Sequence, residues 1–154
     1  MTTRGSFLIT AAVVFAWSQA IGGESLPIDC TVLPLSQGRA LTAQCSRVSP
    51  AKVTGFWTPS VAQVLAVEQR LAALLSKSGH KIDLARTRRQ YIGIISSGKK
   101  FIYLNAILAE RPDPRDPDWR STAGMVCDGG DAFWGVQFDP TDGAFHNLGF
   151  NGEA

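Results

Sequence analysis

The chain has 154 residues, of which 18% are charged and 45% are hydrophobic, and its formal net charge is +2. This length suits one domain, and low charge with ample apolar content argues against a disordered chain. The near balance of 15 basic and 13 acidic residues predicts no strongly basic face. We therefore expect no nucleic-acid partner, and no cofactor motif is recognisable.

Residues 1–20 are typical of a secretory signal peptide. Arg4 supplies a positive start, residues 7–17 form an apolar run, and Ala20 ends a small-residue cleavage site. As a helix this run would rise about 16 Å, which is too short for a bilayer core of about 30 Å. We expect cleavage near Ala20, no membrane span after cleavage, and export to a bacterial periplasm or the medium. The alternative is an uncleaved N-terminal anchor.

Three cysteines, Cys30, Cys45 and Cys127, follow the predicted signal peptide. Export permits disulfides, and an odd number leaves one cysteine unpaired within a monomer. Cys30 and Cys45 are close in sequence, and a bridge between them would close a loop of roughly 15 residues. We favour this bridge, while a bridge from either residue to Cys127, or no bridge, remains open.

The clearest predicted element is a helix over residues 61–77. Thr58 can cap it, Pro59 fits its first position, and residues 78–79 supply a stop. Its apolar side gathers Val61, Val64, Leu65, Val67, Leu71, Ala72, Leu74 and Leu75. Residues 21–57 before it contain many glycines and prolines, so we expect an irregular region with short extended pieces around 28–35 and 40–48.

A sheet is expected under this helix. A hairpin turn is predicted at residues 96–99, and Gly93 inside the preceding strand indicates a bulge or a close approach by another backbone. Residues 111–118 hold three prolines and are expected to form a solvated connector. The predicted strands are 90–95, 101–106, 125–127, 133–138 and 144–150.

A helix followed by a strand meander predicts an α+β fold, with one amphipathic helix packed on a four- to five-stranded antiparallel meander. In element order alone this layout resembles cystatin-like folds, and such a likeness implies no function. We expect residues 58–154 to form this helix-plus-sheet domain and residues 21–57 to belong to the same globular unit.

Glu68 falls near the middle of the apolar side of the helix, between Leu75 and Val61 on the helical wheel. A carboxylate at such a position is costly unless it is paired or solvated. Three interpretations stay open: a buried ion pair with Arg88 or Arg89, exposure at the edge of the packing, or a functional carboxylate that lines a cleft.

Residues 127–135 (CDGGDAFWG) carry the densest local pattern. Two adjacent glycines predict a tight turn, which Asp128 and Asp131 would cap. A cation bound with Asp139 and Asp142 is an alternative, but the spacing of an EF-hand loop is missing, so no metal site is assigned.

The remaining candidate functional residues are the two histidines and the aromatic residues. A thiol-protease arrangement of Cys127 and His146 lacks a flanking signature, and His80 with His146 does not supply the three or four ligands that zinc needs. Most aromatic side chains are expected in the core. Trp57 and Trp119 adjoin loops rich in glycine and proline, so we predict that they are exposed binding anchors.

Three stretches together resemble a known group: residues 89–105 (RQYIGIISSGKKFIYLN), 126–139 (VCDGGDAFWGVQFD) and 150–152 (FNG). They are similar to small exported proteobacterial proteins of unknown function that share a Cys-Asp-Gly-Gly turn, a Phe-Trp-Gly strand and a Phe-Asn-Gly ending. The resemblance implies a bacterial envelope setting and brings no catalytic residue. It does not cover Cys30 and Cys45.

The leading hypothesis is an exported, non-enzymatic interaction module that binds a protein or an envelope component, with an inhibitor or immunity-like role fitting its size. One alternative is an envelope hydrolase that uses Glu68 with Asp128 or Asp131 as an acid–base pair. Another is small-ligand binding in an apolar cavity between helix and sheet, lined by Val64, Leu71 and sheet aromatics.

Overall fold

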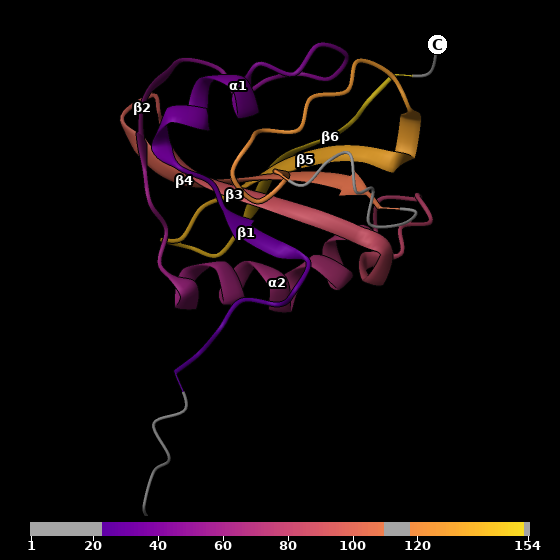
Figure 1. The fold of residues 1–154 in the computed structure, drawn as a ribbon, viewed down its shortest axis with the longest axis horizontal. Coiled ribbons are helices and arrows are strands. Elements are labelled where there is room, and N and C mark those ends of the chain that lie inside the picture. The colour runs from indigo at the N-terminus through magenta and orange to yellow at the C-terminus, as the bar shows by residue number, and fades with distance from the viewer. Residues whose placement is uncertain (1–22, 110–117, 153–154) are drawn as a thin grey trace, which may run out of the picture.

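A computed structural model describes residues 23–109 and 118–152 of the chain. They form a mixed α+β fold with a six-stranded, mostly antiparallel sheet (Figure 1). The predicted fold class is therefore confirmed. The predicted signal peptide and nearly all of the proline-rich connector lie outside the described residues. In the described ranges no helix is long and apolar enough to cross a bilayer.

A long hairpin forms the centre of the sheet. β3 (Thr87–Ser96) and β4 (Lys99–Leu108) pair antiparallel along their whole lengths. Ser97 and Gly98 join them, both at positive φ, as a two-residue hairpin turn requires. β5 (Phe133–Phe138) and β6 (Phe145–Phe150) extend the sheet beyond β4, which confirms the predicted meander.

Two short strands share the outer edge of β3. β1 (Cys30–Val32) pairs parallel with residues 89–91, and β2 (Val53–Trp57) pairs antiparallel with residues 93–96. The region expected to be irregular therefore supplies two strands and raises the number from the expected four or five to six. The described residues also contain three 3₁₀ turns: Leu35–Gln37, Leu84–Arg86 and Gly130–Ala132.

Two strand predictions are wrong. Of residues 40–48, the first three belong to the short helix α1 (Gly38–Thr42), and the chain bends after them. Residues 125–127 form no strand. The Cys45–Cys127 disulfide joins these two segments. They cross the face of the sheet opposite α2, so their backbones do not extend its hydrogen-bonded edge (Figure 1).

The predicted amphipathic helix is α2 (Val61–Leu75). Its N-cap is Ser60 and not the predicted Thr58. The Ser60 hydroxyl accepts a hydrogen bond from the Gln63 amide, and the Gln63 side chain accepts one from the Ser60 amide. This capping box satisfies two free amides at once, which explains why the helix begins after Pro59.

The two faces of the sheet carry different cores. On the α2 side, Val64, Val67 and Leu71 are fully buried against alternate strand residues: Tyr91, Ile102, Leu104, Ala106, Trp134, Val136 and Phe138. The alternation predicted for residues 133–138 is thus confirmed. The opposite face holds a smaller cluster of Leu33, Leu41, Ile92, Ile94 and Tyr103. Val53, Phe56, Phe101 and Ala123 pack against this cluster and are partly buried.

Gly93 lies in β3 directly beneath the indole ring of Trp57, and a Cβ atom there would be 2.3 Å from the ring. The close approach predicted at this glycine therefore comes from a side chain. Trp57 is fixed over it by a hydrogen bond of 3.2 Å from Nε1 to the Ile94 carbonyl. We expect Gly93→Ala to displace the ring and lower the free energy of unfolding by about 1–3 kcal/mol in urea denaturation.

Gly55→Ala in β2 is the matched control, because its Cβ would meet only the flexible end of Ile95 at 3.3 Å. The control should remain within about 1 kcal/mol of the parent protein. Similar losses in both variants would show that the indole does not depend on Gly93.

Candidate functional site

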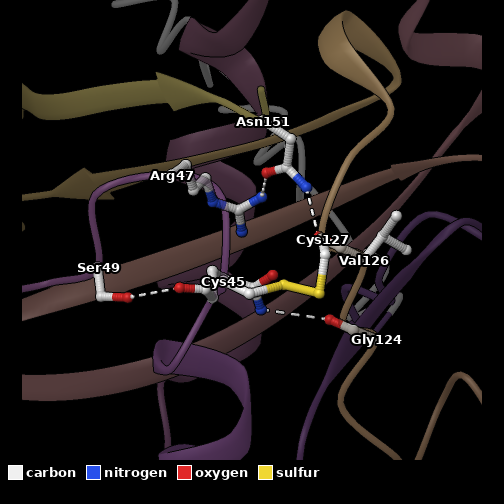
Figure 2. The surroundings of a disulfide bond; sticks show 8 residues. Cys45, Arg47, Ser49, Gly124, Val126, Cys127 and Asn151 are labelled. Carbon is white, nitrogen blue, oxygen red and sulfur yellow. Dashed lines mark hydrogen bonds between the residues drawn. A yellow bond between two sulfur atoms is a disulfide. The ribbon is translucent and has the colours of Figure 1, made fainter. Parts of the chain in front are cut away.

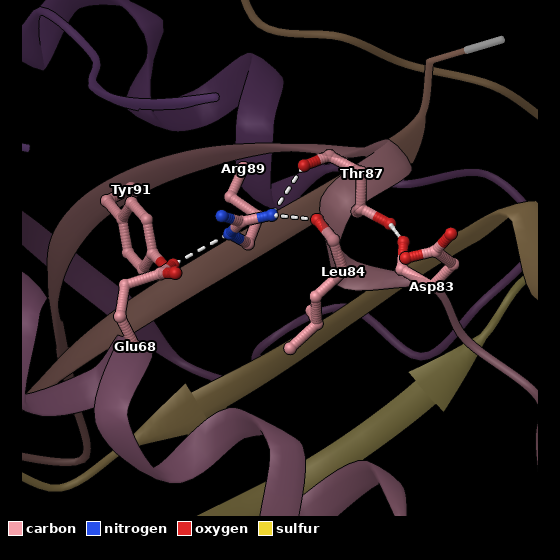
Figure 3. A network of polar contacts seen from close by, with 6 residues as sticks. All are labelled: Glu68, Asp83, Leu84, Thr87, Arg89 and Tyr91. Carbon is pink, nitrogen blue, oxygen red and sulfur yellow. Dashed lines mark hydrogen bonds and ion pairs between the residues drawn. The ribbon is translucent and has the colours of Figure 1, made fainter. Parts of the chain in front are cut away.

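Glu68 lies in a polar network on the α2 side of the sheet (Figure 3). Its Oε1 atom is 2.7 Å from Arg89 Nε and also accepts a short hydrogen bond from the Tyr91 hydroxyl. The side chains of Glu68 and Arg89 are only 13% and 6% exposed. Arg89 Nη1 also donates to the Leu84 carbonyl at 2.8 Å. The interpretation of Glu68 as a buried ion pair is confirmed, with Arg89 as the partner.

Cys30 lies beside this ion pair and is 3% exposed. Burial, followed by the Glu68 carboxylate, raises the pKa of the Cys30 thiol to about 12. The same two causes raise the pKa of Tyr91 well above its usual value. Both groups therefore stay protonated at neutral pH.

The predicted bridge between Cys30 and Cys45 is wrong. Cys45 pairs with Cys127, with 5.0 Å between their Cα atoms, and Cys30 is a free thiol. Pairing of β1 with β3 turns the Cys30 side chain into the core under α2. Cys45 lies on the other face, so closeness in sequence does not bring these two thiols together.

The hydrolase alternative gains no support from the placement of its carboxylates. Asp131 Oδ1 is 2.5 Å from His80 Nδ1, and the His80 ring stacks on Phe150 at 3.7 Å between centroids. Asp128 forms a backbone bridge with Gly152. Within residues 23–109 and 118–152 no hydrogen bond or ion pair joins Glu68 to either aspartate.

The cavity expected for a small ligand is occupied by packing. Val64 and Leu71 are fully buried in one cluster with Tyr91 and Trp134. These are the side chains that would have lined the cavity, so this alternative gains no support either.

Both tryptophan candidates are half-buried and not exposed as predicted. The Trp119 ring makes cation–π contacts with the guanidinium groups of Arg88 and Arg120, which lie 5.2 and 4.4 Å from its centroid. Lys100 Nζ lies 5.3 Å from the Trp57 ring. The rings are thus engaged within the chain, and a role as binding anchors stays a prediction.

The cation alternative involves the turn between β5 and β6. Asp139 accepts from the Thr141 amide and Asp142 from the Ala144 amide, each at 2.8 Å. The first of these bonds lowers the pKa of Asp139. Asp139, Asp142 and His146 have ligand atoms within 4.8 Å of one another. Hydrogen bonds from backbone amides of the turn explain the positions of both carboxylates, so we assign no metal ion.

The second polar network lies on the opposite face of the sheet and centres on Arg47, which is 9% exposed (Figure 2). Arg47 Nη1 donates to Asn151 Oδ1 at 2.9 Å. Arg47 Nη2 donates to the Tyr103 hydroxyl at 3.1 Å and makes a short hydrogen bond to Asn105 Oδ1. All three acceptors are uncharged.

The amides of this network hold the segment that leads to Cys127. Asn105 Nδ2 donates to the Gly124 carbonyl at 3.0 Å, and Gly124 N donates to Gln90 Oε1 at 2.9 Å. Asn151 Nδ2 donates to the Val126 carbonyl at 2.6 Å (Figure 2). Residues from β3, β4 and the end of β6 therefore fix this segment over the sheet.

Two paired glycines form the floor under Arg47. Gly135 of β5 and Gly149 of β6 are cross-strand partners. A Cβ at Gly135 would lie 2.9 Å from Arg47 Nη2, and one at Gly149 would touch the Arg47 stem at 3.8 Å. Each of the three stretches that carry the resemblance supplies residues around Arg47. Residues 89–105 supply Tyr103 and Asn105, residues 126–139 supply Gly135, and residues 150–152 supply Asn151. Sequence reasoning missed Arg47, because nothing in its surroundings marks it as buried.

A surface depression of about 650 Å³ lies beside this network, between residues 45–48 and β6. We call it the β6 groove, and it is lined by Cys45, Ser46, Arg47, Val48, Asn147, Leu148, Gly149 and Phe150. Val48 is 85% exposed beside it. In the described part of the chain, two buried side-chain atoms lack a hydrogen-bond partner: Arg47 Nε and Ser46 Oγ. Both belong to residues of the groove.

β6 ends the strand order, and no described strand pairs with its outer side. The Asn151 amide donates inward to Phe133 O, and the Gly152 amide donates outward to Ser46 O. Backbone groups alternate between the two sides of a strand. Those of Leu148 and Phe150 therefore point outward along the groove.

No family model matches the chain, and no curated protein or solved structure is significantly similar to it.

Glu68→Gln keeps the side-chain shape but leaves the buried guanidinium of Arg89 without a counter-charge. We expect the free energy of unfolding to fall by about 3 kcal/mol in urea denaturation. Gln69→Ala, at the exposed neighbouring position of α2, should change it by no more than about 0.5 kcal/mol. Equally small changes in both variants would contradict a structural role for the ion pair.

Cys30 should resist alkylation in the folded, unreduced protein, because only the thiolate reacts and the thiol is buried with a pKa of about 12. We expect mass spectrometry to find almost no iodoacetamide label at about pH 8 under native conditions, when free thiols with ordinary pKa values react. In urea without reductant, Cys30 alone should be labelled. A label on Cys45 or Cys127 in that sample would contradict the disulfide pairing.

Proposed function

We propose that the chain is an exported, non-enzymatic binding module that recognises an extended segment of a partner protein at the β6 groove. The observation that carries this proposal is the unpaired outer side of β6 beside a depression of about 650 Å³. Proteins often bind extended peptides by adding them as a strand to such an edge, with neighbouring pockets giving specificity.

The length of the free edge limits what backbone pairing can contribute. Asn147 has a positive φ of 54°, and the pairing of β5 with β6 shifts register between Gly135 and Gln137. An added strand would therefore pair mainly with residues 148–150, because a bulge interrupts the regular ladder before them. The partner must gain further affinity from side-chain contacts in the groove, and the exposed Val48 offers apolar area for them.

Two observations support export. Residues 1–20 have the pattern of a signal peptide, and Cys45 is bonded to Cys127. Structural disulfides persist mainly in oxidising compartments such as the periplasm or the medium. A protein or another envelope component then meets the groove outside the cytoplasm.

A photo-crosslinking amino acid placed at position 48 or position 147 in exporting cells tests the groove. We expect both positions to give the same discrete adduct, with the crosslinks mapping to one short segment of the partner. The same amino acid at Val61, an exposed valine at the start of α2, is the matched control and should give none. Adducts at all three positions, or none at the two groove positions, would reject this surface.

A further inference from the structure

Among the residues that the structure describes, Arg47 is a buried cation without an acidic partner. Its hydrogen bonds in the described ranges reach Asn151, Tyr103 and Asn105, all of which are neutral. Buried charges in proteins are normally paired with an opposite charge, because removal from water is costly. Arg89 on the other face shows the usual solution, with Glu68 at 2.7 Å.

The hydrogen-bond pattern around Arg47 is also incomplete. Arg47 Nε and the adjacent Ser46 Oγ are buried and have no partner among the described residues. Nearly all buried polar groups in native proteins are bonded, so two adjacent exceptions call for an explanation. An N–H group can only donate and a hydroxyl can donate, so what is missing is an acceptor.

We propose that the β6 groove binds a carboxylate carried by the partner segment, with Arg47 Nε and Ser46 Oγ as its donors. One carboxylate oxygen accepts from the guanidinium and one accepts from the hydroxyl. This inference rests on the proposed function for the source of the carboxylate, but its chemistry can be tested on the isolated protein. Both donor atoms are covered in the structure, so entry of the anion requires neighbouring side chains to rearrange.

Charge favours a carboxylate over a phosphate. The site has one uncompensated positive charge and two donors without a partner. A carboxylate brings one negative charge and two oxygens, which match them. A phosphate group brings a charge between about −1.5 and −2 and three acceptor oxygens, which would leave charge and oxygens unmatched in a buried place.

The test follows the Arg47 Nε–H resonance by nitrogen-15 NMR in the full, unreduced chain, during titration with sodium acetate at constant ionic strength. We expect a saturable shift at Arg47. Arg70, whose Nη1 donates to the Gly143 carbonyl at the surface, serves as the internal control and should not saturate. Sodium phosphate forms the second arm and should bind more weakly than acetate.

Ser46→Ala should weaken acetate binding about tenfold, the size expected for one hydrogen bond to a charged group. It should not lower the stability of the protein, because the Ser46 hydroxyl bonds to nothing in the described chain. Ser49→Ala is the matched control: its hydroxyl donates to the Gln44 carbonyl at 3.3 Å, so acetate affinity should remain unchanged. Equal affinity of the two variants would overturn the role of Ser46.

The outcomes separate this inference from the proposed function. No saturable acetate shift at Arg47, as when water alone fills the site, overturns the carboxylate assignment even if the groove crosslinks persist. Stronger binding of phosphate than of acetate also overturns it. A saturable acetate shift without any groove crosslink supports the carboxylate site but rejects the partner segment, leaving a small free carboxylate as the ligand.

Discussion

The buried guanidinium of Arg47 is the interaction on which the polar network opposite α2 depends. Its three hydrogen bonds reach β4 through Tyr103 and Asn105, and the residue after β6 through Asn151. Without a donor between them, these side chains would be buried with unsatisfied acceptors, at a cost of about 1–3 kcal/mol each. The face that no long helix covers is therefore closed by a cation lying on Gly135, and any side chain at that glycine would collide with it.

The disulfide between Cys45 and Cys127 holds the same region together covalently. Cys45 and Cys127 are separated by 82 residues. In the chain-entropy model, a bond that closes a loop of this length lowers the entropy of the unfolded chain and so raises the free energy of unfolding by about 4.5 kcal/mol. The shorter loop between Cys30 and Cys45 would raise it by less. Cys45 lies two residues before Arg47, so the bond also limits how far the wall of the β6 groove can move.

The sequence predicts those helices and strands in which apolar residues repeat at a regular spacing. The apolar stripe of α2 and the alternation in β5 each repeat over enough residues to be recognised, and Glu68 stands out because it interrupts that stripe. β1 and β2 have three and five residues, too few for a period to show. Their positions depend on the edge of β3, which local sequence does not encode.

The cysteine pairing and Arg47 could not be read from the sequence for a related reason. Distance along the chain does not say which face of a sheet a side chain occupies, and Cys30 and Cys45 occupy different faces. An arginine among glycines and prolines suggests a solvated loop. Its burial requires Gly135, which comes from a strand about ninety positions later and contributes only by lacking a side chain.

The proposed carboxylate site rests on a contrast between the two buried arginines. Arg89 has its carboxylate inside the chain, and with Glu68 and Tyr91 it closes a network that joins α2 to β3. Arg47 has neutral partners and an Nε–H group without an acceptor, and it borders a groove next to an unpaired strand edge. Among the described residues, one buried guanidinium is therefore paired with a carboxylate, whereas the other is held by neutral groups alone, and this difference is why we assign the proposed anion to Arg47. The proposed carboxylate site borders the edge of β6 at which we propose that a partner strand is added, so one binding event would complete both the ladder of β6 and the bonding of Arg47.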